Sequence, residues 1–103
     1  MFQMISMKQL EGILDRGGNF TLLDVREREE YENGHLRGAV SIPLDELEAR
    51  AREIPGDRPV IIYCAYGSHS MMAARLLDRM GYRAVNTVGG LASYRGKYFS
   101  ETI

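Results

Sequence analysis

The chain has 103 residues, 45% of them hydrophobic and 26% charged, which suits a globular protein with one core that needs no disulfide or metal. A formal net charge of −1 without any run of Lys and Arg argues against a nucleic-acid partner. No apolar run reaches the ~18 residues of a membrane span, the N-terminus lacks a signal pattern, and one cysteine excludes an internal disulfide. We therefore expect a single cytoplasmic domain over residues 1–103 with no membrane partner.

The first part of the chain alternates strand and helix signals. A short strand is expected over Phe2–Ile5, and Ser6 with Gln9 has the spacing of a capping box, which marks a helix start. The following residues place apolar side chains on one helical face until a Gly-Gly pair ends the pattern. Asn19–Val25 is apolar and β-rich enough to form a central strand.

The middle of the chain has shorter segments. Arg26–Glu32 is predicted as a charged short helix or turn, and Gly34–Gly38 as a loop with a glycine at each end. Ala39–Ile42 is expected to be a brief strand that Pro43 ends. Leu44–Glu53 repeats apolar residues at three- and four-residue steps, which predicts an amphipathic helix with a charged solvent face.

The last part begins with an apolar, β-branched run at Val60, typical of a strand buried on both faces of a parallel sheet. A helix follows and stops at Gly81, Tyr82–Val88 is the last strand, and a short helix around Leu91–Tyr94 precedes a polar tail. Strands that alternate with helices predict an α/β fold with a central, mostly parallel five-stranded sheet and helices on both faces. The methionines are expected to fill gaps in the core: Met1, Met4, Met7, Met71, Met72 and Met80.

The only cysteine, Cys64, lies between the Val60 strand and the helix that follows it. The carboxyl end of a central parallel strand faces the crevice where open α/β sheets bind ligands. The first turn of a helix offers free N–H groups and a positive dipole end to an anion. This setting favours the nucleophilic thiolate over the thiol. The alternative is a buried structural cysteine.

Three blocks of the sequence stand in order over nearly the whole chain. The first is Leu22–Arg26, a strand end of the form acidic-X-Arg, with Glu30, Tyr31 and the loop Gly34–Ala39 that continues through Ile42 and Pro43. The second is Tyr63–Ser70 with Ala73, Ala74, Gly81 and Tyr82, and the third is Val88–Leu91 with Tyr94. In this order they resemble three signatures of the rhodanese-like domain family: a strand end followed by a Gly-His-Ile-X-Gly-Ala type of loop, the active loop with its helix, and a closing Gly-Gly segment in which Tyr94 stands where the family usually carries Trp.

The resemblance implies a rhodanese-like fold and sulfur transfer. In the family, a cysteine thiolate attacks a sulfane sulfur donor, becomes a persulfide, and passes the sulfur to a thiol or to cyanide. Carried onto this chain, the nucleophile is Cys64, and backbone N–H groups cradle the persulfide without a metal or an organic cofactor. The residues of this substrate-binding loop are Ala65, Tyr66, Gly67, Ser68, His69 and Ser70.

The partners implied by the resemblance are a small sulfur donor, such as thiosulfate or a low-molecular-weight persulfide, and a thiol acceptor. A thioredoxin-like or sulfur-carrier protein is one candidate acceptor. Many family members carry basic residues one and five positions after the cysteine, where this chain has Ala65 and His69. A histidine is charged only in part near neutral pH, so we expect weak capture of the thiosulfate dianion and less effect on persulfide carriage. A solvated role for His69 in the loop is the alternative.

Three further residues have structural interpretations. Asp24 and Arg26 stand at a strand end, where an ion pair or backbone hydrogen bonds would support the loops around the cysteine; substrate contact is the alternative. His35, between two glycines, is expected to bond nearby backbone rather than act as a base. One cysteine and two histidines show no metal-ligand spacing.

Two rival functions remain open. A cysteine-dependent phosphatase related to the rhodaneses needs an Arg six residues after the nucleophile to hold phosphate oxygens bidentately, and Ser70 occupies that position. A non-catalytic interaction or regulatory module is the other rival, because a fold does not by itself fix a function. The presence of Cys64 favours sulfur transfer over this second rival.

Overall fold

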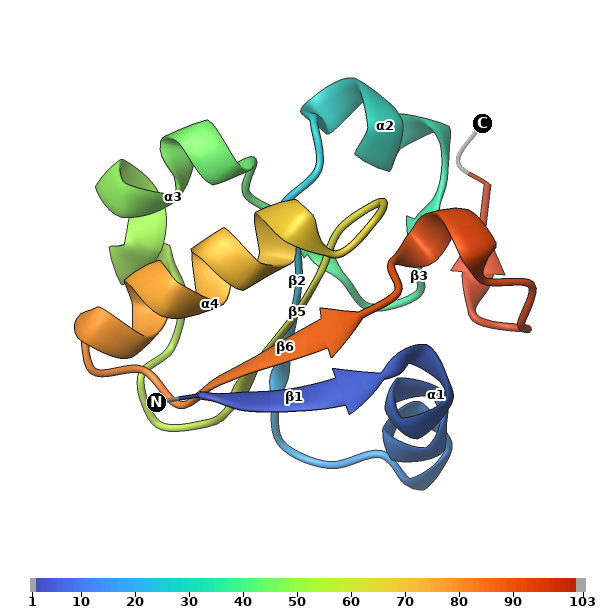
Figure 1. The fold of residues 1–103 in the computed structure, drawn as a ribbon, viewed down its shortest axis with the longest axis horizontal. Helices are drawn as coiled ribbons and strands as arrows, with labels where there is room; N and C mark the ends of the chain where they lie inside the picture. Colours follow the sequence, from blue (N-terminus) through green and yellow to red (C-terminus); the bar gives the residue numbers. More distant parts are fainter. Residues whose placement is uncertain (1, 102–103) are drawn as a thin grey trace.

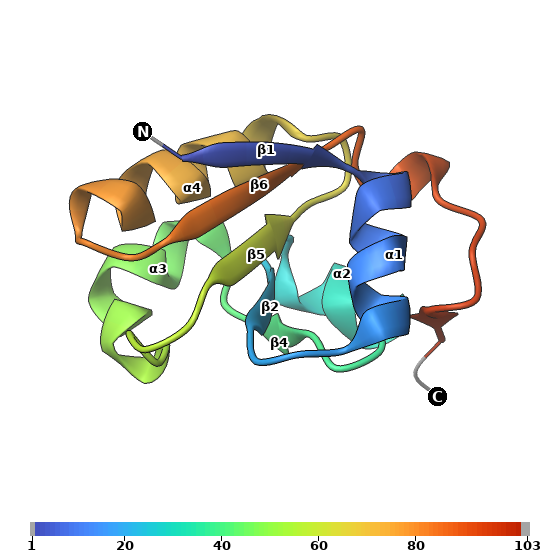
Figure 2. The ribbon, with the colours of Figure 1, turned by 90° about the horizontal axis from the view of Figure 1, so that it is seen from below.

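The computed structural model describes residues 2–101. Its main sheet has five parallel strands in the order β1-β6-β5-β2-β4, which can be followed in Figure 2. The strands are β1 (Gln3–Ser6), β2 (Thr21–Asp24), β4 (Val40–Ser41), β5 (Val60–Tyr63) and β6 (Ala84–Val88). The predicted α/β architecture is confirmed, although most strands begin or end a few residues inside the predicted ranges.

Helices cover both faces of this sheet (Figure 2). One core lies under α3, η1 and α4, and the other lies under α1 and η2. None of the helices within residues 2–101 combines the length and the apolar character needed to cross a membrane. The helices are α1 (Met7–Arg16), α2 (Arg28–Asn33), α3 (Leu44–Arg50), α4 (Ser68–Arg79), and the short 3₁₀ turns η1 (Ala51–Glu53) and η2 (Leu91–Ser93).

The helix ends follow the local signals in the sequence. The capping box at α1 is confirmed: Ser6 Oγ accepts from Gln9 N at 3.0 Å, and Ser6 N donates to Gln9 Oε1 at 2.8 Å. Helix α4 stops before Gly81, which has φ +95°. Strand β5 is buried at all of its residues, as its apolar run predicted.

A second, two-stranded sheet was missed by the sequence analysis. Strand β3 (His35–Leu36) lies in the predicted Gly34–Gly38 loop and pairs antiparallel with β7 (Phe99–Ser100) in the predicted polar tail. The ring of Phe99 lies against Gly34, where a Cβ atom would overlap it. This contact fixes the C-terminal segment beside the carboxyl end of the main sheet (Figure 1).

The expectation for the methionines was partly wrong. Met4, Met72 and Met80 are exposed by 47%, 56% and 47%, so they do not fill the core. Helix α4 instead buries small residues such as Ala73 and Ala74 together with Leu77, which brings the helix close to the sheet and leaves longer side chains at its flanks. Met7 and Met71 are half-buried, and Met1 lies outside the described residues.

Candidate functional site

Cys64 directly follows β5, the middle strand of the sheet, and the first residue of α4 is Ser68. The side chain is only 2% exposed, and its sulfur is surrounded by donors. Gly67 N donates to Sγ at 3.0 Å and Ser70 N donates at 3.2 Å. Sγ also lies 3.4 Å from Ser70 Oγ, within reach of a hydrogen bond. Two backbone N–H groups thus converge on one sulfur atom and favour negative charge there.

Within residues 2–101, the loop residues other than Gly67 and Ser70 make no hydrogen bond to the sulfur of Cys64. Tyr66 is 80% exposed and His69 is also exposed, whereas Ser70 is fully buried. Ala65 and Ser68 line the cavity that leads to the sulfur. The backbone of the loop, rather than its side chains, therefore forms the cradle.

Glycines in the loop and hydrogen bonds from η2 fix the conformation of the cysteine loop. Gly67 has φ +99°, which side-chain-bearing residues rarely adopt. Leu91 N donates to Cys64 O at 2.8 Å and Ala92 N donates to Ala65 O at 2.9 Å. Gly90 packs directly on the Ala65 carbonyl, where a Cβ atom would overlap it. The Gly-Gly segment and η2 thus fix the backbone on which the cysteine lies.

Gly67→Ala should cut the rate of persulfide formation on Cys64 by about tenfold to a hundredfold, because a hydrogen bond to a charged group contributes about 1.5–3 kcal/mol. The control is Gly38→Ala, since Gly38 also has a positive φ of +86° but nothing within 4 Å of its added Cβ. Both variants should lose about 1–2 kcal/mol of stability through backbone strain. Mass spectrometry of samples quenched at timed intervals measures the rate of persulfide formation, and thermal unfolding measures the stability of each variant. Equal effects of the two substitutions on the rate would contradict a preformed cradle.

The predicted ion pair between Asp24 and Arg26 is present and buried. Arg26 Nε lies 3.0 and 3.1 Å from the two carboxylate oxygens, Arg26 Nη2 donates to Oδ2 at 2.7 Å, and Nη2 also donates to Gly34 O at 2.6 Å. Asp24 is fully buried and Arg26 is 9% exposed. Burial acts to lower the pKa of Arg26, but hydrogen bonds and charge from Asp24 outweigh it and raise that pKa. The pair ties the end of β2 to the loop before β3.

Tyr63 completes this network. Its hydroxyl donates to Asp24 Oδ2 at 2.7 Å and accepts from Leu36 N at 3.1 Å. Burial, followed by the charge of Asp24, raises the pKa of Tyr63 far above its usual value, so the phenol keeps its proton and remains a donor. β2, β5 and β3 are therefore connected immediately below the cysteine loop.

His35 lies apart from the cavity that reaches the sulfur. Its Nδ1 is 2.8 Å from Tyr31 O, and its ring stacks on the Tyr31 ring at 3.8 Å. The expected bond to nearby backbone is confirmed. Among residues 2–101, no three side chains of His, Cys, Asp or Glu are grouped so that they could hold a metal ion.

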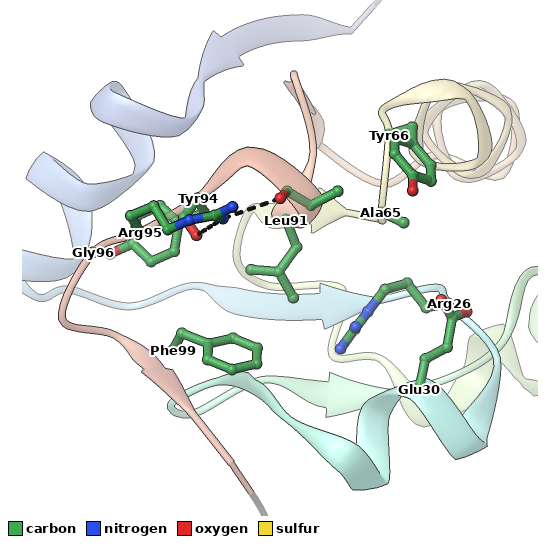
Figure 3. Close-up of a pocket in the computed structure, with 10 residues that line it drawn as sticks. Arg26, Glu30, Ala65, Tyr66, Leu91, Tyr94, Arg95, Gly96 and Phe99 are labelled. Carbon is green, nitrogen blue, oxygen red and sulfur yellow. Dashed lines mark hydrogen bonds between the residues drawn. The ribbon is translucent and has the colours of Figure 1, made fainter.

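Two cavities meet at the loop. The smaller one, of about 230 Å³, reaches Cys64 and includes two carboxylates, Glu27 and Glu30, that the sequence analysis did not assign to the site. The larger one, of about 550 Å³, extends to the C-terminal segment and includes Tyr94, Arg95 and Phe99 (Figure 3). The charged run at residues 26–32 was the sequence signal for Glu27 and Glu30. No local pattern indicated that residues 94–99 line a cavity.

Comparisons with known proteins agree with this geometry. The chain is 40% identical over 94 residues to "Putative sulfur carrier protein YrkF" of Bacillus subtilis. The aligned region covers 90% of this chain and 51% of that protein. It is 39% identical over 71 residues to thiosulfate sulfurtransferase PspE of Escherichia coli, and this aligned region covers 67% of this chain and 68% of that protein. The chain thus spans about half of the first relative and about two thirds of the second.

Solved structures show the same fold. A rhodanese-like domain protein from Staphylococcus aureus matches with a TM-score of 0.89 and 24% identity over 99% of this chain and 100% of the other. The rhodanese-like domain of an Anabaena protein matches with a TM-score of 0.86 and 28% identity over 98% of this chain and 80% of the other. Residues 6–97 match the family described as "Rhodanese-like domain". The chain belongs to the rhodanese-like domain family.

Proposed function

We propose that this chain is a sulfurtransferase that carries sulfane sulfur as a persulfide on Cys64. The observation that supports this most directly is the convergence of Gly67 N and Ser70 N on Sγ, at 3.0 and 3.2 Å, in a loop braced by η2. The donor is thiosulfate or a persulfide, and the acceptor is a thiol or cyanide. Relatives named as a thiosulfate sulfurtransferase and a sulfur carrier support this class of reaction.

The transfer has two steps. In the first, the Cys64 thiolate attacks the outer sulfur of the donor, a new S–S bond forms at Cys64, and the donor's own bond to that sulfur breaks. Thiosulfate leaves as sulfite, and a persulfide leaves as its thiolate, each with the electron pair of the broken bond. In the second step an acceptor thiolate attacks the outer sulfur and regenerates the Cys64 thiolate, whose charge the two N–H groups stabilise. With cyanide the product is thiocyanate.

The charges around the cavity favour some donors over others. Glu27 and Glu30 line the cavity at Cys64, and Arg26 is already paired with Asp24. The exposed His69 is the remaining basic side chain among the residues that line this cavity. A dianion is repelled by the two carboxylates, whereas a neutral or singly charged persulfide is repelled less. We therefore propose that a persulfide, rather than thiosulfate, is the better donor.

His69→Arg should lower the apparent KM for thiosulfate by severalfold and up to about tenfold, since 1.4 kcal/mol is a factor of ten. The gain should shrink as salt rises, because His69 is exposed and its new charge would be screened. The measurement is a thiosulfate titration of both proteins at two ionic strengths, with an uncharged persulfide donor as the control that should not respond. An unchanged or raised KM at low salt would contradict a role for charge at this position.

Mass spectrometry of the intact protein tests the function itself. After incubation with thiosulfate or a persulfide donor, the protein should gain the mass of one sulfur atom, located on the peptide that contains Cys64. Addition of a thiol or cyanide should then remove it. Failure to gain sulfur from any donor would overturn the proposal and favour a non-catalytic interaction module. The phosphatase alternative receives no support from the site, because the sixth position after Cys64 holds the buried Ser70.

A further inference from the structure

The 3₁₀ turn η2 holds two carbonyl groups of the cysteine loop. Leu91 N donates to Cys64 O at 2.8 Å, and Ala92 N donates to Ala65 O at 2.9 Å. In a planar trans peptide unit the N–H group points opposite to the C=O group. The two bonds therefore turn the N–H groups of Ala65 and Tyr66 away from η2 and fix the backbone on which Cys64 lies.

Tyr94 directly follows η2 and connects it to α1. Its N donates to Leu91 O at 3.0 Å, and its hydroxyl donates to Glu11 Oε2 at 2.5 Å. The same hydroxyl accepts from Tyr98 N at 3.4 Å. Burial, followed by the hydrogen bond to Glu11, raises the pKa of Tyr94, so the phenol keeps its proton and is the donor. A residue 83 positions earlier in the chain thus holds the end of η2.

The contact between Tyr94 and Glu11 is covered by Gly96. A Cβ atom at Gly96 would overlap both the Tyr94 hydroxyl and the Glu11 carboxylate. Tyr94 and Gly96 line the larger cavity (Figure 3), whereas Glu11 lines neither of the two cavities at the loop. An effect of Glu11 on the reaction would therefore pass through Tyr94 and η2 rather than through contact with a substrate.

We propose that Glu11 is a positioning residue for Cys64 and that it acts through Tyr94 and η2. The inference rests on the sulfur transfer proposed above. While Glu11 holds Tyr94, η2 keeps the two loop carbonyl groups in place, and the loop keeps the shape in which Gly67 N and Ser70 N converge on Sγ. Without that hold η2 shifts, the two donors move off the sulfur, and the thiolate loses part of its stabilisation.

Glu11→Ala and Tyr94→Phe each remove the hydrogen bond from one side and should have the same effect. The rate of persulfide formation at neutral pH should fall by about threefold to tenfold, and the midpoint of the pH–rate profile should rise by about half a unit to one unit. The double variant should be no slower than either single variant, because the two residues act through one contact. Glu11→Gln should recover most of the rate, since its amide oxygen still accepts from the hydroxyl.

The matched control is Tyr98→Phe. Tyr98 Oη donates to Asp15 Oδ1 at 2.6 Å, so it also joins the C-terminal segment to α1. Tyr98 lies beyond η2, however, and lines neither cavity. The two Tyr→Phe variants should lose similar amounts of stability in thermal unfolding, but Tyr98→Phe should leave the rate and the pH–rate profile unchanged.

The pH–rate profile separates positioning from a general loss of stability. It is measured by mass spectrometry of quenched samples with one persulfide donor, and the ultraviolet absorbance of the thiolate gives a second titration, with Cys64→Ser as the blank. The charged and titratable side chains that share the smaller cavity with the sulfur are the same in the wild type and in the Glu11, Tyr94 and Tyr98 variants: Arg26, Glu27, Glu30, Tyr66 and His69. A shift of the profile would therefore report the backbone around Cys64.

An unchanged rate and profile in Glu11→Ala, or an equal change in Tyr98→Phe, would overturn the inference. The wild type would still form its persulfide in that case, so the proposed function would stand. If the wild type formed no persulfide from any donor, the proposed function would fail, and the titration of the thiolate would decide separately whether Glu11 positions Cys64.

Discussion

Cys64→Ser is expected to reduce sulfur transfer to below about 1% of the wild-type rate while the protein remains folded. A serine oxygen is nearly isosteric with the sulfur and accepts the same hydrogen bonds from Gly67 N and Ser70 N. A hydroxyl is scarcely ionised at neutral pH, however, and is a poor nucleophile toward sulfur. The measurement is thiocyanate or persulfide production, together with thermal unfolding and intact mass after exposure to a donor.

Cys64→Ala separates the chemical role of the sulfur from its structural role. Alanine removes the acceptor and leaves two N–H groups unpaired beneath a side chain that is 2% exposed in the wild type. This should cost about 1–3 kcal/mol of stability that the serine variant retains, although both variants are inactive. Activity above a few per cent in Cys64→Ser would show that transfer does not use a thiol, because the chain has only one cysteine.

The parts of the structure that follow from local sequence signals were predicted. The capping box at Ser6, the apolar run at Val60 and the stop at Gly81 each depend on a few neighbouring residues, and each was found. The place of Cys64 at the end of a central strand follows from the same local patterns, because parallel strands end at one edge of a sheet.

The parts that depend on contacts between distant segments were not predicted. β3 and β7 contain two residues each, too few for a period to show, and their pairing joins the middle of the chain to its end. Consequently the segment that carries Arg95 and lines the larger cavity was expected to be a polar tail. The carboxylates of Glu27 and Glu30 were recognised as charges, but their place at Cys64 depends on contacts between the segment around α2 and a loop more than thirty residues further along the chain. Local patterns carry no information about such pairings.

Asp24→Asn is expected to lower the free energy of unfolding by about 3–5 kcal/mol, because it leaves the buried guanidinium of Arg26 without its counter-charge. The control is Asp57→Asn. Asp57 also meets an Arg Nε, that of Arg58, at 2.9 Å, but it is 70% exposed, whereas Asp24 is fully buried. An exposed pair contributes about 0–1 kcal/mol, so the control should unfold almost as the wild type does. Denaturant titration of both variants measures the difference.

The double variant Asp24→Asn/Arg26→Gln should be more stable than Asp24→Asn alone, since no unpaired charge remains buried. It should still form the persulfide more slowly than the wild type. Asp24 accepts from both Arg26 and Tyr63, and Arg26 reaches Gly34 O, so weaker substitutes would loosen the strand ends beneath Cys64. If Asp24→Asn cost no more than Asp57→Asn, the network would not stabilise the fold. If the double variant recovered stability and kept the full rate of persulfide formation, the network would not hold the cysteine loop in its reactive geometry.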